Sequence, residues 1–115
     1  MKIKQMKSFL WAVILLTGPL YANHGSLDCT KVKRGSCEAL ICNSDELMDL
    51  DMEFAIAYKE AKVKTSKADM LKAHQIAWAK NRNECWKVPD VNKYLIDIYH
   101  IRIKELKEKY TISNT

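Results

Sequence analysis

The sequence of 115 residues is poor in glycine and proline, with three glycines and two prolines. Three glycines are too few for a Gly-rich phosphate-binding loop, and too few for a sheet with many tight turns. Hydrophobic residues make up 48% of the chain and aromatic residues 9%, which excludes a disordered or low-complexity protein. Length and composition therefore predict one small all-helical domain.

The sequence also has little that would cross a membrane. Its N-terminal apolar stretch, Phe9 to Leu16, is eight residues long, whereas a membrane-spanning helix needs about 20. Three lysines precede this stretch, and Gly18-Pro19 and the small residue Ala22 follow it, which is the pattern of a secretory signal peptide. We therefore expect residues 1–22 to be removed on export rather than kept as an anchor. The domain 23–115 would then be periplasmic or secreted, without a membrane contact.

The net charge is small once the expected signal peptide is removed. The sequence has 19 basic and 14 acidic residues, and removing the three N-terminal lysines leaves 16 against 14, a net charge of +2. Nucleic-acid binding needs a concentrated basic face, whereas the remaining lysines are scattered. We therefore expect no nucleic-acid partner.

Acidic residues concentrate in one short segment, where five of nine residues are acids. Two interpretations are open: acids that stabilise the start of a helix and its solvated face, or a patch that attracts a basic partner. The five acids are Asp45, Glu46, Asp49, Asp51 and Glu53.

Four cysteines, Cys29, Cys37, Cys42 and Cys85, lie in the domain 23–115. A redox-active C-x-x-C motif is absent. The cysteines are separated by seven, four and 42 residues and the histidines stand apart at 24, 74 and 100, so a complete set of zinc ligands at the usual spacing is not expected. An even number of cysteines in an exported domain predicts two structural disulfides, whose pairing the residues alone leave open among three alternatives. We expect no metal and no cofactor.

Serine caps mark the first two expected helices. Residues 23–35 have no periodicity and predict a loop. Ser36 is placed to cap a short helix over 37–42, and Ser44 to cap a long helix that ends near Lys64.

Two more long helices follow after short connections. Ser66 with Asp69 is a variant of the capping box, and Pro89-Asp90 predicts the start of the last helix. Short connections imply antiparallel neighbours, so we expect an all-α fold: a small antiparallel three-helix bundle with a short N-terminal helix, stapled by disulfides. The expected inward stripes are Leu47, Leu50, Phe54, Tyr58 and Ala61, then Leu71, Gln75, Trp78, Arg82 and Cys85, then Val91, Leu95, Ile98, Ile101 and Leu106.

Polar residues on these stripes predict a buried network. A carboxylate on an inward face must be paired or it will protonate, and the guanidinium group of arginine suits such a partner. We therefore expect Asp51 to pair with Arg82 or Arg102, with Gln75 nearby. We interpret this network as structural, setting the helix register, rather than as catalytic.

Several short motifs follow one another along the expected mature chain. In the first half they are Asp28-Cys29, Ile41-Cys42, Leu47-x-x-Leu50-Asp51 and Tyr58. In the second half they are Gln75-x-x-Trp78-x-x-x-Arg82-Asn83-x-Cys85-Trp86-Lys87 and Tyr99-x-x-Arg102-Ile103-x-Glu105-Leu106.

This ordered set resembles the LprI-type lysozyme inhibitor family over nearly the whole mature chain. The resemblance implies an exported, disulfide-bonded, all-helical bacterial envelope domain. The family usually has a second cysteine where Tyr94 stands here, and an apolar residue at the place of Cys37. With this shift the resemblance implies the disulfides Cys29–Cys42 and Cys37–Cys85. The signature residues, which we interpret as structural, are Asp51, Tyr58, Gln75, Trp78, Arg82, Tyr99 and Arg102.

The function that the resemblance implies is inhibition of a lysozyme-type peptidoglycan hydrolase. Such an inhibitor would place a loop in the enzyme cleft and offer hydrogen-bond donors to the two catalytic carboxylates. The candidate loops are 62–67, with Lys64 and Lys67, and 86–90, with Trp86 and Lys87. The acids Asp45, Glu46 and Asp49 are a further candidate contact with a basic enzyme.

An alternative function is an envelope interaction module that binds a protein or an envelope component and has no hydrolase target. We do not expect an enzyme, because the sequence shows no Ser-His-Asp constellation and no metal spacing. His74, next to the Gln75 stripe, is interpreted as a partly exposed helical histidine rather than a base.

Overall fold

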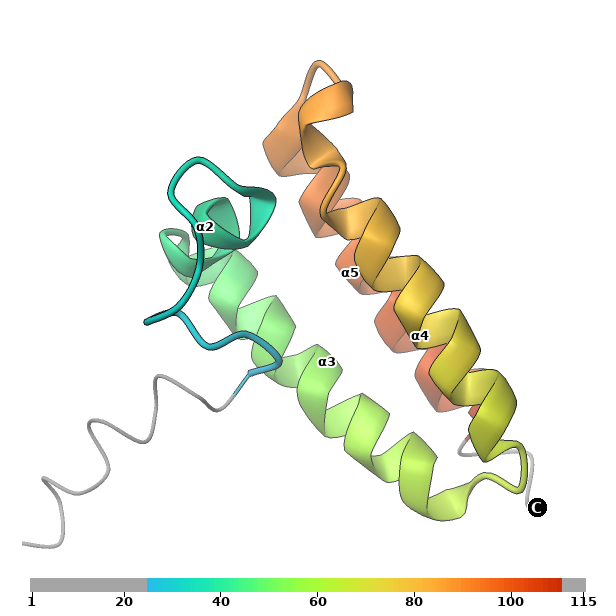
Figure 1. Ribbon diagram of the computed structural model, residues 1–115. Helices are drawn as coiled ribbons and strands as arrows, with labels where there is room; N and C mark the ends of the chain where they lie inside the picture. Colours follow the sequence, from blue (N-terminus) through green and yellow to red (C-terminus); the bar gives the residue numbers. More distant parts are fainter. Residues whose placement is uncertain (1–24, 111–115) are drawn as a thin grey trace, which may run out of the picture.

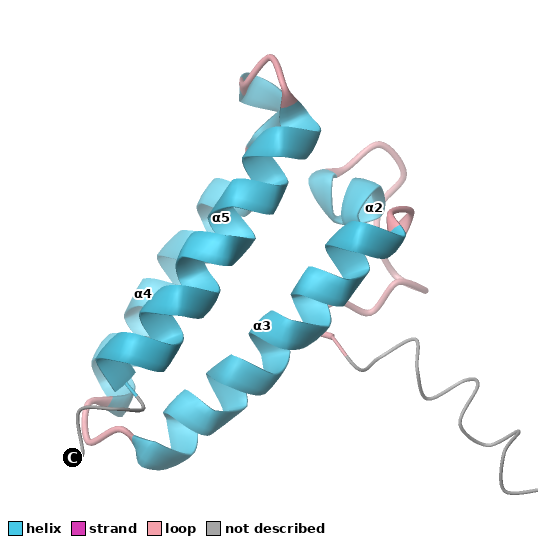
Figure 2. Cartoon of the chain, turned by 180° about the vertical axis from the view of Figure 1, so that it is seen from behind, coloured by secondary structure: helices cyan, strands magenta, loops and turns pink. Residues whose placement is uncertain are grey.

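The protein is described by a computed structural model, which describes residues 25–110. This part of the chain consists of helices and connecting loops, without a strand (Figures 1 and 2). The three long helices run up and down in turn, so consecutive helices are antiparallel (Figure 1). The prediction of an all-α bundle with a short N-terminal helix is confirmed. In chain order the elements are α2 (Cys37–Cys42), α3 (Asp45–Lys64), α4 (Ala68–Arg82), the 3-10 turn η2 (Cys85–Lys87), α5 (Val91–Glu105) and the π turn η3 (Leu106–Tyr110).

Polar side chains cap three of these helices. The hydroxyl of Ser36 accepts a hydrogen bond from the backbone N–H of Ala39, and that of Ser44 from the N–H of Leu47. The carboxylate of Asp90 accepts from the N–H of Lys93 at the start of α5. Each cap satisfies a backbone N–H that has no partner within its helix.

The capping box predicted for α4 is wrong. Lys67, not Ser66, occupies the N-cap position, and its side chain makes no cap hydrogen bond. The N–H of Lys67 instead donates to the hydroxyl of Thr65 at 2.9 Å, because a threonine at the end of a helix readily forms such a local turn. Helix α4 therefore begins at Ala68, one residue later than a Ser66 cap with its first helical residue at 67 would place it.

The core lies mainly between α3 and α5 with its π turn, and α4 packs more lightly against both. Leu47, Leu50 and Phe54 of α3 are buried, as are Leu95 and Leu106 on the opposite side. Burial of these side chains is the main favourable contribution to folding.

An aromatic cluster joins the three long helices. The rings of Phe54 and Trp78 are stacked with centroids 5.0 Å apart, and Tyr99 meets Trp78 edge-on at 5.1 Å. The indole N–H of Trp78 donates to the backbone carbonyl of Ile98 at 3.3 Å. Offset and edge-on ring pairs contribute beyond the area that they bury, so the cluster fixes α4 against α3 and α5.

The apolar stripe predicted for α5 is wrong at Ile101, which is 59% exposed. Tyr99 and Ile103 are buried instead. Position 101 precedes the buried Arg102, and one residue turns a helix by about 100°. The stripe therefore follows Leu95, Tyr99, Arg102 and Leu106, and the polar residues within it belong to the buried face.

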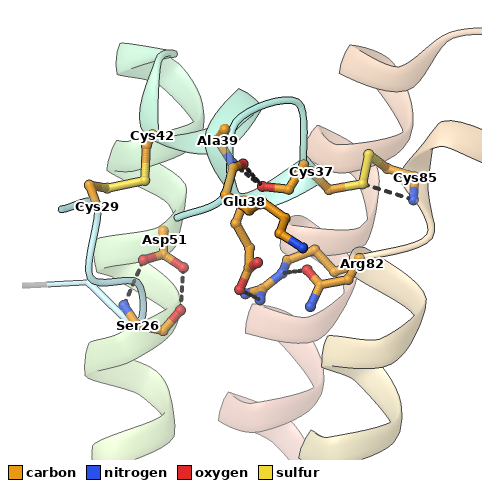
Figure 3. A network of polar contacts seen from close by, with 12 residues as sticks. Ser26, Cys29, Cys37, Glu38, Ala39, Cys42, Asp51, Arg82 and Cys85 are labelled. Atoms are coloured by element: carbon orange, nitrogen blue, oxygen red, sulfur yellow. Dashed lines mark hydrogen bonds and ion pairs between the residues drawn. A yellow bond between two sulfur atoms is a disulfide. The ribbon is translucent and has the colours of Figure 1, made fainter. Parts of the chain in front are cut away.

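Two disulfides hold the N-terminal part of the fold (Figure 3). Cys29 and Cys42 join the lead-in loop to α2, and Cys37 and Cys85 join α2 to η2. These are the pairs that the family resemblance implies. The loop before α2 ends at Gly35, whose φ of +81° lies in the left-handed region that glycine adopts without strain.

The buried carboxylate of Asp51 is paired, but the expectation of an arginine partner is wrong. Its oxygens accept hydrogen bonds from the hydroxyl of Tyr99 at 2.7 Å and from both the N–H and the hydroxyl of Ser26 at 2.6 Å (Figure 3). Gly25 passes so close to this carboxylate that a Cβ there would overlap it. The network therefore fastens the N-terminal segment to the N-terminal half of α3.

Both arginines are buried and pair with glutamates. Arg82 lies 3.6 Å from Glu38 of α2 (Figure 3) and over the ring of Trp78. Arg102 lies 3.2 Å from Glu105 and donates from Nε to Gln75 at 2.9 Å. Arg82 thus lies at the end of α4 beside α2, and Arg102 lies against the middle of α4. Among the described residues neither forms an ion pair with Asp51.

The expected signal peptide, 1–22, lies outside the described residues. Within 25–110, no helix has the length and apolar character that a membrane span requires. The two disulfides fit a protein that matures in an oxidising compartment.

Candidate functional site

The residues predicted to contact a partner lie at opposite ends of the bundle. Lys64 and Lys67 flank the turn between α3 and α4, whereas Trp86 and Lys87 lie in η2 at the other end (Figure 1). Since α3 alone has 20 residues, and a helix rises about 1.5 Å per residue, the two ends are about 30 Å apart. A single compact partner cleft would therefore engage one loop or the other.

The loop that carries Trp86 is rigidly built. The N–H of Glu84 donates to the carbonyl of Asn81, that of Lys87 to Glu84, and that of Val88 to Cys85. These consecutive hydrogen bonds tighten the end of α4 into η2. We call the segment from Cys85 to Asp90, which ends at the cap of α5, the Trp86 tip.

A disulfide joins the Trp86 tip to α2. Cys85 is fully buried, is bonded to Cys37 of α2, and its N–H donates to the sulfur of Cys37 at 3.2 Å. The next residue along the chain, Trp86, is 70% exposed. The disulfide therefore holds the backbone of a large exposed aromatic side chain, which limits the conformational entropy that this segment would lose on binding.

The charges at the Trp86 tip are already paired within the chain. The ammonium group of Lys87 lies 3.4 Å from Glu84 and over the ring of Trp86. Both side chains of this ion pair are about half exposed, so water screens it and the pair is weak. Lys87 can exchange Glu84 for a carboxylate of a partner at little cost.

The acidic patch is smaller than the sequence predicted. Asp45, Glu46 and Asp49 are exposed on the first turns of α3, but Asp51 is buried and belongs to the core network. Glu53 is paired with Lys107 at 3.7 Å. The exposed acids therefore lie at the same end of the bundle as the Trp86 tip (Figure 1).

The loop at the opposite end borders an apolar surface that the sequence did not predict. Ile56 and Val63 of α3 are 63% and 79% exposed, and they line a shallow hollow beside Lys64. They are seven residues apart, so they share a face of the helix. That spacing is visible in the sequence, but only burial of the other faces shows that this one is exposed.

The signature residues lie in the helix interfaces and not on the outer surface. Asp51, Arg82, Tyr99 and Arg102 are buried, and the remaining three are half-buried: Tyr58, Gln75 and Trp78. Burial raises the pKa of Tyr99 above its ordinary value of 10.0, and the negative charge of Asp51 raises it further. Tyr99 therefore stays a neutral hydrogen-bond donor to Asp51.

Groups that carry common catalytic chemistry do not gather at the Trp86 tip. Between residues 25 and 110, no three His, Cys, Asp or Glu side chains lie in an arrangement that would hold a metal ion. His74 lies on α4, where its Nδ1 is 2.8 Å from the hydroxyl of Tyr110. What this end offers instead is an exposed, anchored aromatic residue with cations and acids around it, which is the chemistry of a protein interface.

No family model matches the chain, and comparison with curated proteins and with solved structures gives no match. The resemblance to the LprI-type family therefore stays a prediction from the sequence motifs.

Proposed function

We propose that this chain is an exported binding protein that inhibits a lysozyme-type peptidoglycan hydrolase through its Trp86 tip. The family resemblance supports the class of target, and the two disulfides support export to an oxidising compartment. The observation that carries the choice of surface is the exposure of Trp86 directly beside the buried, disulfide-bonded Cys85.

The chemistry of the target fits this surface. Hydrolases of this class work with two carboxyl groups, one protonated and one ionised, on either side of a cleft. The ring of Trp86 would fill part of the cleft, where sugars bind, and the ammonium group of Lys87 would meet the ionised carboxylate. The exposed acids of α3 would then face the basic surroundings of such an enzyme and speed the encounter.

The proposal is tested by inhibition of muramidase activity. The purified protein is added in micromolar excess to several types of lysozyme, and turnover of peptidoglycan is followed. We expect at least one type to be inhibited. Absence of an effect on all of them would refute the proposal.

Trp86→Ala locates the inhibiting surface. Truncating a central interface tryptophan costs about 2 kcal/mol or more, which is about 30-fold in affinity. Because Trp86 is exposed, folding stability should change by less than about 0.5 kcal/mol. Ile56→Ala, at another exposed apolar residue far along α3, is the matched control and should inhibit normally. Equal inhibition by both variants would exclude the Trp86 tip.

The alternative, an envelope interaction module with no hydrolase target, is distinguished by co-purification. The protein is used as bait against envelope extract and against lysozymes in parallel. Recovery of a non-hydrolase envelope protein that Trp86→Ala no longer retains would favour this alternative over inhibition.

A further inference from the structure

A second concave site lies on the side of the bundle, between α4 and the end of α5. It has a volume of about 330 Å³, which is at the small end of the range for ligand sites. Trp78 and Asn81 of α4 line one wall, and Arg102, Glu105 and Lys109 line the other. The Trp86 tip does not contribute to it.

Arg102 is the unusual residue of this hollow. It is 3% exposed, its Nε donates to Gln75 and its Nη1 to Glu105. Its Nη2 is buried and has no hydrogen-bond partner among the described residues. An unpaired buried donor on a charged group is costly to maintain, and native proteins keep few of them.

The π turn η3 forms one end of the hollow. Helix α5 widens into η3 at Leu106, and this turn brings the buried Tyr110 back toward α4, where its hydroxyl meets His74 at 2.8 Å. Such π segments occur frequently at functional sites. When Tyr110 donates to Nδ1, the neutral imidazole carries its proton on Nε2, and His74 becomes a further donor at the rim.

The charge of the hollow favours a single negative charge. Arg102 and Lys109 are cationic and Glu105 is anionic, so these three side chains together carry one net positive charge. A dianion would meet repulsion from Glu105, which lies 3.2 Å from Arg102. Only Nη2 of Arg102 is without a partner, so a carboxylate there would accept one charge-assisted hydrogen bond from the guanidinium group rather than a bidentate pair.

We propose that this hollow binds a small organic carboxylate. The carboxylate accepts hydrogen bonds from Nη2 of Arg102 and from Lys109, and the apolar part of the ligand rests against Trp78. Nη2 is buried in this conformation, so binding requires neighbouring side chains to move. Glu105, with 39% of its side chain exposed, and the exposed Lys109 both line the hollow and can change rotamer. The volume admits a molecule of about the size of an acylated amino acid.

The test is an NMR titration of the 15N-labelled protein, produced from the full-length chain under oxidising conditions. The probes are N-acetyl-L-alanine, which has the carboxylate, and N-acetyl-L-alaninamide, which lacks it, at the same pH and ionic strength. We expect saturable shifts of the Arg102 Nε–Hε signal and of the amides of His74 and Lys109 with the acid alone. Equal shifts with both probes, or shifts that do not saturate, would overturn the proposal.

Variants separate this site from general attraction of anions. Lys109→Ala should weaken binding of N-acetyl-L-alanine by about threefold or more, as expected for a partly exposed charge contact. Lys104→Ala removes an exposed lysine of α5 that does not line the hollow, and should leave the affinity unchanged. Equal weakening by both variants would show nonspecific electrostatics and refute the site.

A longer probe identifies the source of the carboxylate. N-acetyl-trialanine binding at least as tightly as N-acetyl-L-alanine would indicate the C-terminus of a peptide. Binding of the single residue alone would indicate a free small acid. Neither outcome depends on inhibition of a hydrolase, so the proposal for this site and the proposal for the Trp86 tip can be refuted independently.

Discussion

The Cys37–Cys85 disulfide should contribute more to stability than the Cys29–Cys42 disulfide. The first joins residues separated by 48 positions, and the second joins residues separated by 13. A cross-link stabilises mainly by restricting the unfolded chain, and the restriction grows with the length of the closed loop. The two double variants, C37A/C85A and C29A/C42A, isolate these contributions.

The expected magnitudes follow from loop length. In the chain-entropy relation, a separation of 48 corresponds to about 4 kcal/mol at 25 °C and one of 13 to about 3 kcal/mol. Cys37 and Cys85 are also buried, whereas Cys29 and Cys42 are half-buried, so lost packing adds to the same difference. A domain of this size has a total stability of about 5–15 kcal/mol, so C37A/C85A should lose a large share of its unfolding free energy.

Guanidinium unfolding followed by far-UV circular dichroism measures these values. We expect a lower midpoint for C37A/C85A than for C29A/C42A, with similar dependence of the unfolding free energy on denaturant. If C29A/C42A is as destabilised as C37A/C85A, or more so, the reasoning is refuted. Inhibition assays on the same proteins test whether the disulfide positions Trp86. Only C37A/C85A should inhibit more weakly than the wild type.

Two further predictions concern the Asp51 network. Because the pKa of Tyr99 is raised above 10.0 in the folded state, its contribution is fully present below about pH 10 and is lost as the pH rises further. The unfolding free energy should fall by about 1.4 kcal/mol per pH unit more steeply in the wild type than in Tyr99→Phe; identical slopes would contradict this. Gly25→Ala places a Cβ against the Asp51 carboxylate and should cost about 1–3 kcal/mol by breaking the hydrogen bonds to Ser26. Unchanged thermal unfolding of this variant would show that the segment adjusts freely.

Local signals predicted most of the helix boundaries. Ser36 and Ser44 precede acids and apolar residues, and a serine at that point satisfies the free N–H groups of a helix start. Where two neighbouring residues compete for the same role, local chemistry does not decide. Thr65 accepts a hydrogen bond from the N–H of Lys67, and α4 begins after Lys67 without the cap expected from Ser66.

Tertiary contacts explain what the sequence could not predict. Ile101 is apolar but exposed, and the hydroxyl of Tyr99 is buried because Asp51 accepts its hydrogen bond. Exposure of Trp86 follows from the direction in which the disulfide holds η2, and no periodicity encodes it. The hollow beside Arg102 depends on the π turn, which has no simple sequence signal.

The positions of the disulfides make one end of the bundle more resistant to local unfolding than the other. Both involve α2 and lie at one end of the fold, and between residues 25 and 110 no disulfide holds the other end. There the first two turns of α4 bury Leu71 alone. Fraying should start at the α3–α4 turn, where backbone amides would exchange with solvent fastest, while the end that presents Trp86 stays closed.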